Sequence, residues 1–149
     1  MSLRPVRRQK SVTEEKSVTS DLGGTKLIDI CVEYGMSPFL SVIIPAHNEE
    51  KSICRTIRSL LRQDYRSFEI VIVVDGSTDN TIEKLTEAFG FSIMDHEKLP
   101  TSLQHAEVLQ ILNVTYRDIP IYLMKKENGG KGDTLNAGID FCRGVFLSV

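Results

Sequence analysis

Three short polar motifs in this sequence carry the residue types from which a ligand site can be built. They are PAHNEE at residues 45–50, DGSTDNT at 75–81 and KENGGKGDT at 126–134. A carboxylate accepts hydrogen bonds from ring N–H and hydroxyl groups, and a glycine-rich helix entry with a lysine presents N–H groups and a cation to an anion. Each motif alone is explained equally well by a turn or a helix cap. A binding site therefore requires that the three motifs meet.

The lysine in the third motif, Lys131, belongs to neither of the standard phosphate-binding fingerprints. A Walker A loop would require glycine at position 125 and Ser or Thr at position 132, where this chain has Lys125 and Gly132. The GxGxxG spacing of dinucleotide-binding loops does not follow the first apolar strand either. A lysine near the N-terminus of a helix is not favoured by the helix dipole, so its position favours a nearby anion over a solvated side chain.

The apolar pattern predicts the strands and helices that position these motifs. Continuous apolar runs indicate buried strands at residues 40–45, 68–74, 119–126 and 144–149. Helical periodicity predicts a helix after each of the first two strands and a third at residues 131–142. Asn48 is expected to be the N-cap of the first helix. Residues 94–118 lack a clear pattern, and we expect them to form a surface insertion with a little helix.

This alternation of buried strands and helices is typical of proteins with a parallel sheet and right-handed crossovers. The fold class that we expect is α/β, a parallel Rossmann-like sheet with flanking helices. In such sheets ligands bind at the carboxyl ends of the strands. All three polar motifs follow a predicted strand, so the sequence predicts that they line one crevice and form a common ligand site.

The composition fits an ordinary globular domain without a strongly charged surface. The chain has 149 residues, of which 41% are hydrophobic and 26% charged, with a net charge of −2. No global basic field would attract nucleic acid or an anionic membrane. The three cysteines are widely spaced, and no apolar run is long enough for a membrane span or a signal peptide. We expect a cytoplasmic protein with reduced thiols and no nucleic-acid partner.

Residues 1–37 are expected to form a flexible N-terminal arm, because the first 25 residues or so are polar and lack periodicity. The sequence does not decide whether residues 26–36 form a short helix or a short strand. The motif DLGGTK at residues 21–26 resembles the phosphate loop of ROK-type sugar kinases. In that family a buried strand leads into the motif, whereas here the preceding EEKSVTS is polar, so we expect a turn. A ROK-like sugar kinase remains one alternative.

Three longer segments together resemble the start of a known enzyme family. They are SVIIPAHNEEKSICRTIRSLLRQDY, FEIVIVVDGSTDNT and KENGGKGDTLNAGI. In this order and at this spacing they look like the beginning of a GT-A inverting glycosyltransferase of family 2. The third segment is similar to the subgroup of poly-N-acetylglucosamine, chitin and hyaluronan synthases. The resemblance implies that residues 38–149 form the N-terminal nucleotide-sugar-binding part of a GT-A domain, incomplete at its C-terminus.

The resemblance also implies which residues bind the donor nucleotide. One wall of a uridine pocket would come from the first motif, through Pro45, Ala46, His47 and Glu49. Asp75 would lie near the uracil or ribose, and Lys131 would neutralise the diphosphate. The chain departs from the family pattern at Val74, where many members have an acidic residue that contacts the uracil. Asp133 and Asn136 are expected to cap and pack rather than to bind.

For the complete enzyme, the resemblance implies transfer of a sugar, N-acetylglucosamine or another hexose, from a UDP-sugar to a glycan acceptor with inversion. Mg²⁺ or Mn²⁺ would assist the departure of UDP. Its D-x-D ligands would follow Val149, as would the catalytic base and the acceptor site. We therefore expect no catalytic or metal-binding residue in this chain, no transferase activity from it alone, and membrane association only through other regions. A non-catalytic nucleotide-binding or degenerate fragment is the main alternative.

Overall fold

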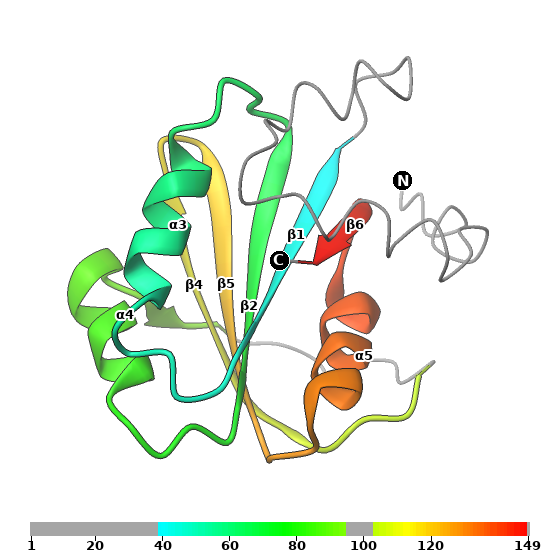
Figure 1. Cartoon of the computed structure of the whole chain (residues 1–149). Coiled ribbons are helices and arrows are strands. Elements are labelled where there is room, and N and C mark those ends of the chain that lie inside the picture. Colours follow the sequence, from blue (N-terminus) through cyan, green and yellow to red (C-terminus); the bar gives the residue numbers. More distant parts are fainter. Residues whose placement is uncertain (1–38, 95–102, 149) are drawn as a thin grey trace.

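A single sheet runs through the centre of the molecule, with helices on both of its faces (Figure 1). The computed structural model describes residues 39–94 and 103–148, with side chains described as far as residue 144. The sheet has six strands in the order β3-β4-β5-β2-β1-β6. In chain order the elements are β1 (Leu40–Ala46), α3 (Ile53–Leu61), β2 (Phe68–Asp75), α4 (Thr81–Phe89), β3 (Ser92–Ile93), β4 (Val108–Tyr116), β5 (Ile119–Lys126), α5 (Lys131–Phe141) and β6 (Val145–Ser148).

Four neighbouring strands, β5, β2, β1 and β6, run parallel and form the centre of the sheet. Alternate side chains of β1 and β2 point to opposite faces. Val42 and Ile44 pack with α3 and α4, whereas Ile43, Val71 and Val73 pack on the face that α5 covers. Both strands are therefore buried on two sides, which accounts for their continuous apolar sequences. The predicted α/β class with a parallel central sheet is confirmed.

The prediction of a surface insertion at residues 94–118 is wrong for the described part of that segment. Residues 108–116 form β4, which pairs antiparallel with β5, and the short β3 pairs antiparallel with β4. The sequence of β4, VLQILNVTY, mixes polar and apolar residues, and only Ile111 and Leu112 in it are buried. Residues 108–116 therefore form a strand mainly because they pair with β5, and less because of their own hydrophobic pattern.

An ion pair between a buried carboxylate and a partly exposed arginine lies at the edge of the sheet where β1 and β2 begin. The fully buried carboxylate of Glu69 accepts hydrogen bonds from Arg143 Nε at 2.9 Å and Nη2 at 2.7 Å. The Ser41 hydroxyl donates to the same carboxylate at 2.7 Å, and the backbone N–H of Arg143 donates at 3.0 Å. Because Arg143 lies between α5 and β6, this pair joins β1 and β2 to the last connection of the chain.

The predictions for residues 1–37, including the flexible arm and the DLGGTK turn, lie outside the described residues. Within residues 39–94 and 103–148, none of the helices combines the length and the apolar character needed to cross a bilayer.

Candidate functional site

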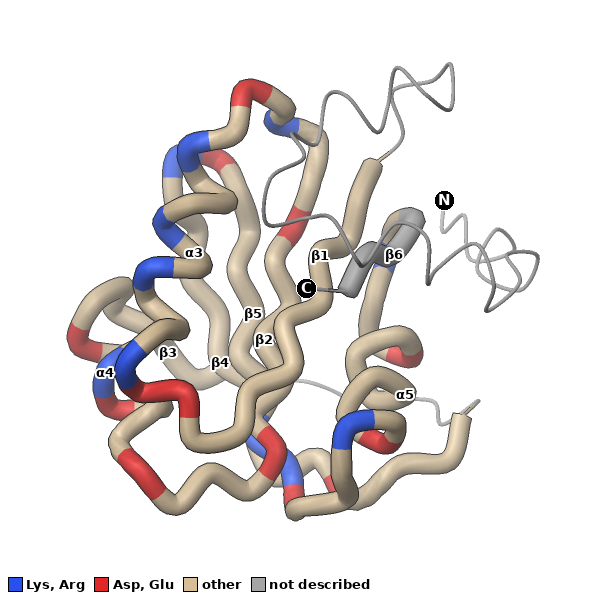
Figure 2. Tube along the Cα trace, in the orientation of Figure 1, with Lys and Arg blue, Asp and Glu red and all other residues tan. Residues whose placement is uncertain are grey.

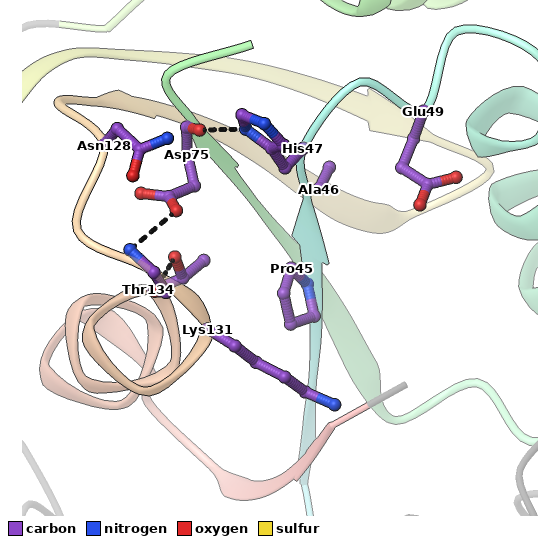
Figure 3. Close-up of a pocket in the computed structure, with 9 residues that line it drawn as sticks. Pro45, Ala46, His47, Glu49, Asp75, Asn128, Lys131 and Thr134 are labelled. Carbon is purple, nitrogen blue, oxygen red and sulfur yellow. Dashed lines mark hydrogen bonds between the residues drawn. The ribbon is translucent and has the colours of Figure 1, made fainter.

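The three polar motifs meet at the carboxyl edge of the parallel strands. β2 pairs with β1 on one side and β5 on the other, so the three strands end next to one another. The loops that follow them enclose a pocket of about 420 Å³. It is lined by Pro45, Ala46, His47, Glu49, Asp75, Asn128, Gly130, Lys131 and Thr134 (Figure 3). The structure thus brings all six predicted donor-binding residues to one pocket and adds Asn128, Gly130 and Thr134.

Asn48 joins the loop after β1 to the loop after β2. Its backbone has a left-handed φ of 53°. Its side-chain oxygen accepts hydrogen bonds from the backbone N–H groups of Thr78 at 2.8 Å and Asp79 at 3.3 Å. The prediction that Asn48 is a helix N-cap is wrong, because α3 begins at Ile53 and Ser52 precedes it. Asn48 instead connects residues 30 positions apart, which local sequence does not reveal.

His47 and Glu49 form the outer wall of the pocket, and both are exposed. The Nδ1 of His47 lies 2.6 Å from the backbone oxygen of Asp75, so this nitrogen carries the proton and donates to that carbonyl. The carboxylate of Glu49 accepts a hydrogen bond from Ser52 Oγ. Figure 3 shows Glu49 on the other side of His47 from Asp75. Protein contacts therefore hold both side chains in place while solvent still reaches them.

The carboxylate of Asp75 organises the glycine-rich loop after β5. One of its oxygens accepts a hydrogen bond from the Gly129 N–H at 2.9 Å, and the other accepts from the Gly130 N–H at 3.0 Å. Lys126 Nζ also donates to it. Asp75 lines the pocket, but most of its hydrogen-bonding capacity serves the protein itself. The contact with uracil or ribose that the family resemblance implies for Asp75 stays a prediction.

Lys126 places a fully buried ammonium group between two carboxylates. Its Nζ lies 2.7 Å from Asp133 Oδ2, donates to the backbone oxygen of Glu127 at 2.7 Å and pairs with Asp75. An ammonium group has three donors, and all three find acceptors here. The only signal of this residue in the sequence is a lysine at the end of an apolar strand, which does not mark it as part of a site. The partner of Lys126 is identified only from the pairing of β2 with β5, whose register places Asp75 opposite Lys126.

The N-terminus of α5 opens onto the pocket, with Lys131 as its first residue. The first N–H groups of a helix have no intrahelical acceptor, and the helix dipole concentrates positive charge there. Lys131 is exposed, and its side chain extends away from Asp75 (Figure 3). Within the described part of the chain, no carboxylate lies at ion-pair distance from it. Its charge is therefore available to a ligand.

Asp133 and Asn136 pack against the chain that leads into β4, and neither lines the pocket. Asp133 Oδ1 accepts a hydrogen bond from the Ala106 N–H at 2.8 Å. Asn136 Nδ2 donates to the backbone oxygen of Gln104 at 2.9 Å. These hydrogen bonds confirm that the two residues pack against this segment, and the expectation that they do not bind a ligand stays a prediction.

Acid is expected to release the glycine-rich loop by protonating Asp75. Burial by itself would raise the pKa of Asp75, but hydrogen bonds from Lys126, Gly129 and Gly130 outweigh burial and lower the pKa below its ordinary value of 3.8. A carboxyl group with a lowered folded-state pKa stabilises the fold at higher pH, and this contribution is lost as the pH falls through that pKa. As the pH falls below 3.8 and through this lowered pKa, we therefore expect the amides of Gly129 and Gly130 to lose protection from hydrogen exchange.

The Asp75→Asn variant is the control for this pH dependence. Its side chain does not ionise, so exchange at the two glycine amides should lose the part of the pH dependence that comes from Asp75. Identical pH profiles for the variant and the original chain would show that another group controls the loop.

Comparisons with known proteins agree with the family resemblance. Residues 41–99 match the family model described as glycosyl transferase family 2. An uncharacterized glycosyltransferase of Rickettsia prowazekii (strain Madrid E) is 32% identical over 112 residues, which cover 75% of this chain and 26% of that protein. A chondroitin synthase and a hyaluronan synthase of Pasteurella multocida are each 30% identical over 111 residues, which cover 74% of this chain and 9% of each synthase.

The family-model match contains the loops after β1 and β2, which form one side of the pocket. The chain spans about a quarter of the Rickettsia relative and less than a tenth of the two synthases, with 26% and 9% of their lengths covered. Together with the sheet and the pocket, these matches confirm the resemblance that the three motifs carry. The chain belongs to glycosyl transferase family 2.

Proposed function

We propose that this chain holds the nucleotide of a UDP-sugar for an inverting glycosyltransferase that passes the sugar to a glycan acceptor. Family membership supports a nucleotide-sugar donor and a glycan acceptor in general. The observation that carries the proposal is the pocket itself, because loops from three separate strands converge on it and are cross-linked through Asn48 and Asp75. A pocket held in this way is largely formed before a ligand arrives.

The chemistry of this pocket, from here on the donor pocket, suits a nucleoside diphosphate. Its volume of about 420 Å³ is in the range of small-molecule sites. Lys131 and the first N–H groups of α5 supply positive charge for the diphosphate. The wall formed by residues 45–49 leaves His47 and Glu49 open to the nucleoside. Val74 is fully buried and does not line the pocket, so base recognition here would depend on other groups.

In the proposed reaction, the acceptor hydroxyl attacks the anomeric carbon of the sugar. The bond from that carbon to the UDP oxygen breaks, the hydroxyl proton passes to a base, and UDP leaves with its negative charge. The part of this chain is to hold the diphosphate and to stabilise that charge through Lys131 and the start of α5. Among the residues that the structure describes, no group of three or more His, Cys, Asp or Glu side chains could hold a metal ion. Mg²⁺ or Mn²⁺, which the resemblance implies for the complete enzyme, stays part of the proposal and is assigned no ligand among these residues.

N-acetylglucosamine is the donor sugar that we propose to test first, with other hexoses as alternatives. The segment NGGKGDTLNAG resembles hexosaminyl synthases, and two relatives are named as chondroitin and hyaluronan synthases. The same resemblance favours a polysaccharide as acceptor. We also propose a cytoplasmic location, as expected from the sequence.

Calorimetric titration of the chain with UDP tests the proposal. We expect UDP to bind without added metal, and Lys131→Met to weaken the binding by about tenfold or more, because a hydrogen bond to a charged group contributes roughly 1.5–3 kcal/mol. Lys125→Met is the matched control. Lys125 is also an exposed lysine in the same segment, but it does not line the donor pocket. Asp75→Ala is a poorer test, since it would also release the glycine-rich loop.

Two results would contradict the proposal. Unchanged UDP affinity in Lys131→Met would show that the Lys131 ammonium group does not contact the diphosphate. Tighter binding of ATP than of UDP would favour the sugar-kinase alternative in place of a UDP-sugar site.

A further inference from the structure

A second pocket lies at the opposite edge of the sheet from the donor pocket. Its volume is about 370 Å³, and it is lined by Arg58, Leu61, Arg62, Ala88, Phe89, Tyr116 and Arg117. These residues come from the C-terminal ends of α3 and α4 and from the turn between β4 and β5. In Figure 1 this turn lies at the end of the sheet where α3 stops, whereas the donor-pocket loops lie at the other end. We call this second site the arginine pocket.

Three arginines line the arginine pocket, and Figure 2 shows the basic positions on and next to α3. Arg58, Arg62 and Arg117 are exposed, and no Asp or Glu lines the pocket. In the described ranges, none of the three has a carboxylate at ion-pair distance. Their hydrogen-bond donors are therefore not engaged by acidic side chains.

Two aromatic rings hold two of these guanidinium groups in place. The guanidinium carbon of Arg58 lies 5.6 Å from the ring centre of Phe89, and that of Arg117 lies 5.5 Å from the ring centre of Tyr116. Stacking on a ring restricts a guanidinium group but leaves its N–H donors free at the edge. Tyr116 is 41% exposed, so its ring also offers an apolar surface at the mouth of the pocket.

The helix ends explain part of this arrangement but not all of it. Arg58 lies in the last turn of α3 and Arg62 is its C-cap, where the helix dipole favours a cation. No helix end accounts for the position of Arg117. Its φ of 48° and that of Asp118, 67°, are left-handed values, which an arginine adopts only at a cost in free energy. A tight turn of this kind favours asparagine or glycine.

We propose that the arginine pocket binds the phosphate group of a ligand whose flat or apolar part lies against Phe89 and Tyr116. Planar guanidinium groups match phosphate oxygens in pairs, and three arginines line this cavity of ligand size. The ligand class is a phosphate ester, supplied either as a soluble molecule or as a lipid headgroup. This site is separate from the donor pocket and does not depend on the function proposed for it.

Pyrophosphate is the probe for this site, and the side-chain Nε–H resonances of the arginines are the readout. We expect the resonances of Arg58, Arg62 and Arg117 to shift during the titration while that of Arg55 does not. Arg55 lies on the same helix and is exposed, but it does not line the pocket. Because each resonance belongs to one arginine, this readout distinguishes binding of pyrophosphate in the arginine pocket from binding in the donor pocket.

Two substitutions test the role of the charges. Arg117→Asn removes a guanidinium group but suits the left-handed backbone, so the chain should fold at least as well while pyrophosphate binds about tenfold more weakly. Arg55→Gln removes a charge from the same helix without touching the pocket and should leave the affinity unchanged. The proposal is overturned if the pocket resonances do not shift, or if Arg55→Gln weakens binding as much as Arg117→Asn does.

Vesicles distinguish the two sources of phosphate. Co-sedimentation with phosphatidylglycerol-containing vesicles, but not with pure phosphatidylcholine, that is lost in Arg117→Asn and kept in Arg55→Gln would identify a lipid headgroup. Pyrophosphate binding without vesicle binding would identify a soluble phosphate ester. Vesicle binding that both variants reduce equally would show a general attraction to the basic side of α3 and would overturn a discrete site.

Discussion

The Lys126→Met variant is expected to lose about 3–5 kcal/mol of its free energy of unfolding. Methionine keeps a long apolar stem, but without the ammonium group Asp75 and Asp133 lose their shared cation. Asp75 is only 5% exposed, so water cannot replace the lost partner well. An uncompensated buried carboxylate destabilises a fold more strongly than the intact pair stabilises it. Urea unfolding should show the loss as a lower midpoint with an unchanged slope.

Lys125→Met shows whether the effect comes from the buried charge. Lys125 is the preceding residue of β5 and is exposed, so we expect its replacement to change stability by no more than about 0.5 kcal/mol. Combining Lys126→Met with Asp75→Asn removes both charges of one pair and should recover part of the loss. Equal stability of the two single lysine variants would show that the buried ammonium group does not stabilise the fold.

The same substitution should also affect the donor pocket. Lys126 and the N–H groups of Gly129 and Gly130 share the carboxylate of Asp75, so the ion pair and the loop support each other. Under conditions in which Lys126→Met remains folded, we expect a looser loop and weaker UDP binding. Lys126 would then be a positioning residue, which acts on the ligand only through the loop that carries Lys131.

The Arg143→Met variant is expected to lose about 3 kcal/mol of its free energy of unfolding. Glu69 is fully buried, and without the guanidinium group it keeps only the Ser41 hydroxyl and one backbone N–H as donors. We place the loss at the lower end of the usual range because the Arg143 side chain is 58% exposed, and water can reach the vacated position. Arg143 also lies against the rings of Phe39 and Tyr122, at 5.9 Å and 5.5 Å, and those contacts would be lost as well.

Arg143→Lys is the matched comparison for this second pair. A lysine keeps the charge but cannot reproduce the two hydrogen bonds that Nε and Nη2 both donate to Glu69 Oε2, so an intermediate stability is expected. The pair lies at the edge of the sheet away from the donor pocket, so UDP binding by folded protein should not change. Urea midpoints of both variants equal to that of the original chain would mean that this pair contributes nothing to stability.

The sequence by itself determined the central part of the fold and the location of the candidate site. β1 and β2 are covered on both faces, and a strand buried in this way leaves a continuous apolar run that can be read without a structure. Because parallel strands end at a common edge, the loops that follow them could be predicted to meet. All six residues predicted for donor binding, Pro45, Ala46, His47, Glu49, Asp75 and Lys131, do line one pocket.

Only the tertiary structure decided the contacts of the charged groups. Asp75 anchors the glycine-rich loop because β2 pairs with β5, which brings it to Lys126, a residue 51 positions away. β4 is a strand because β5 is there to pair with it, although its own pattern is weak. The arginine pocket combines side chains from two helices and a hairpin turn. Local periodicity records which residues are buried, but strand order and register decide which distant charges face one another, and no short stretch of sequence contains that information.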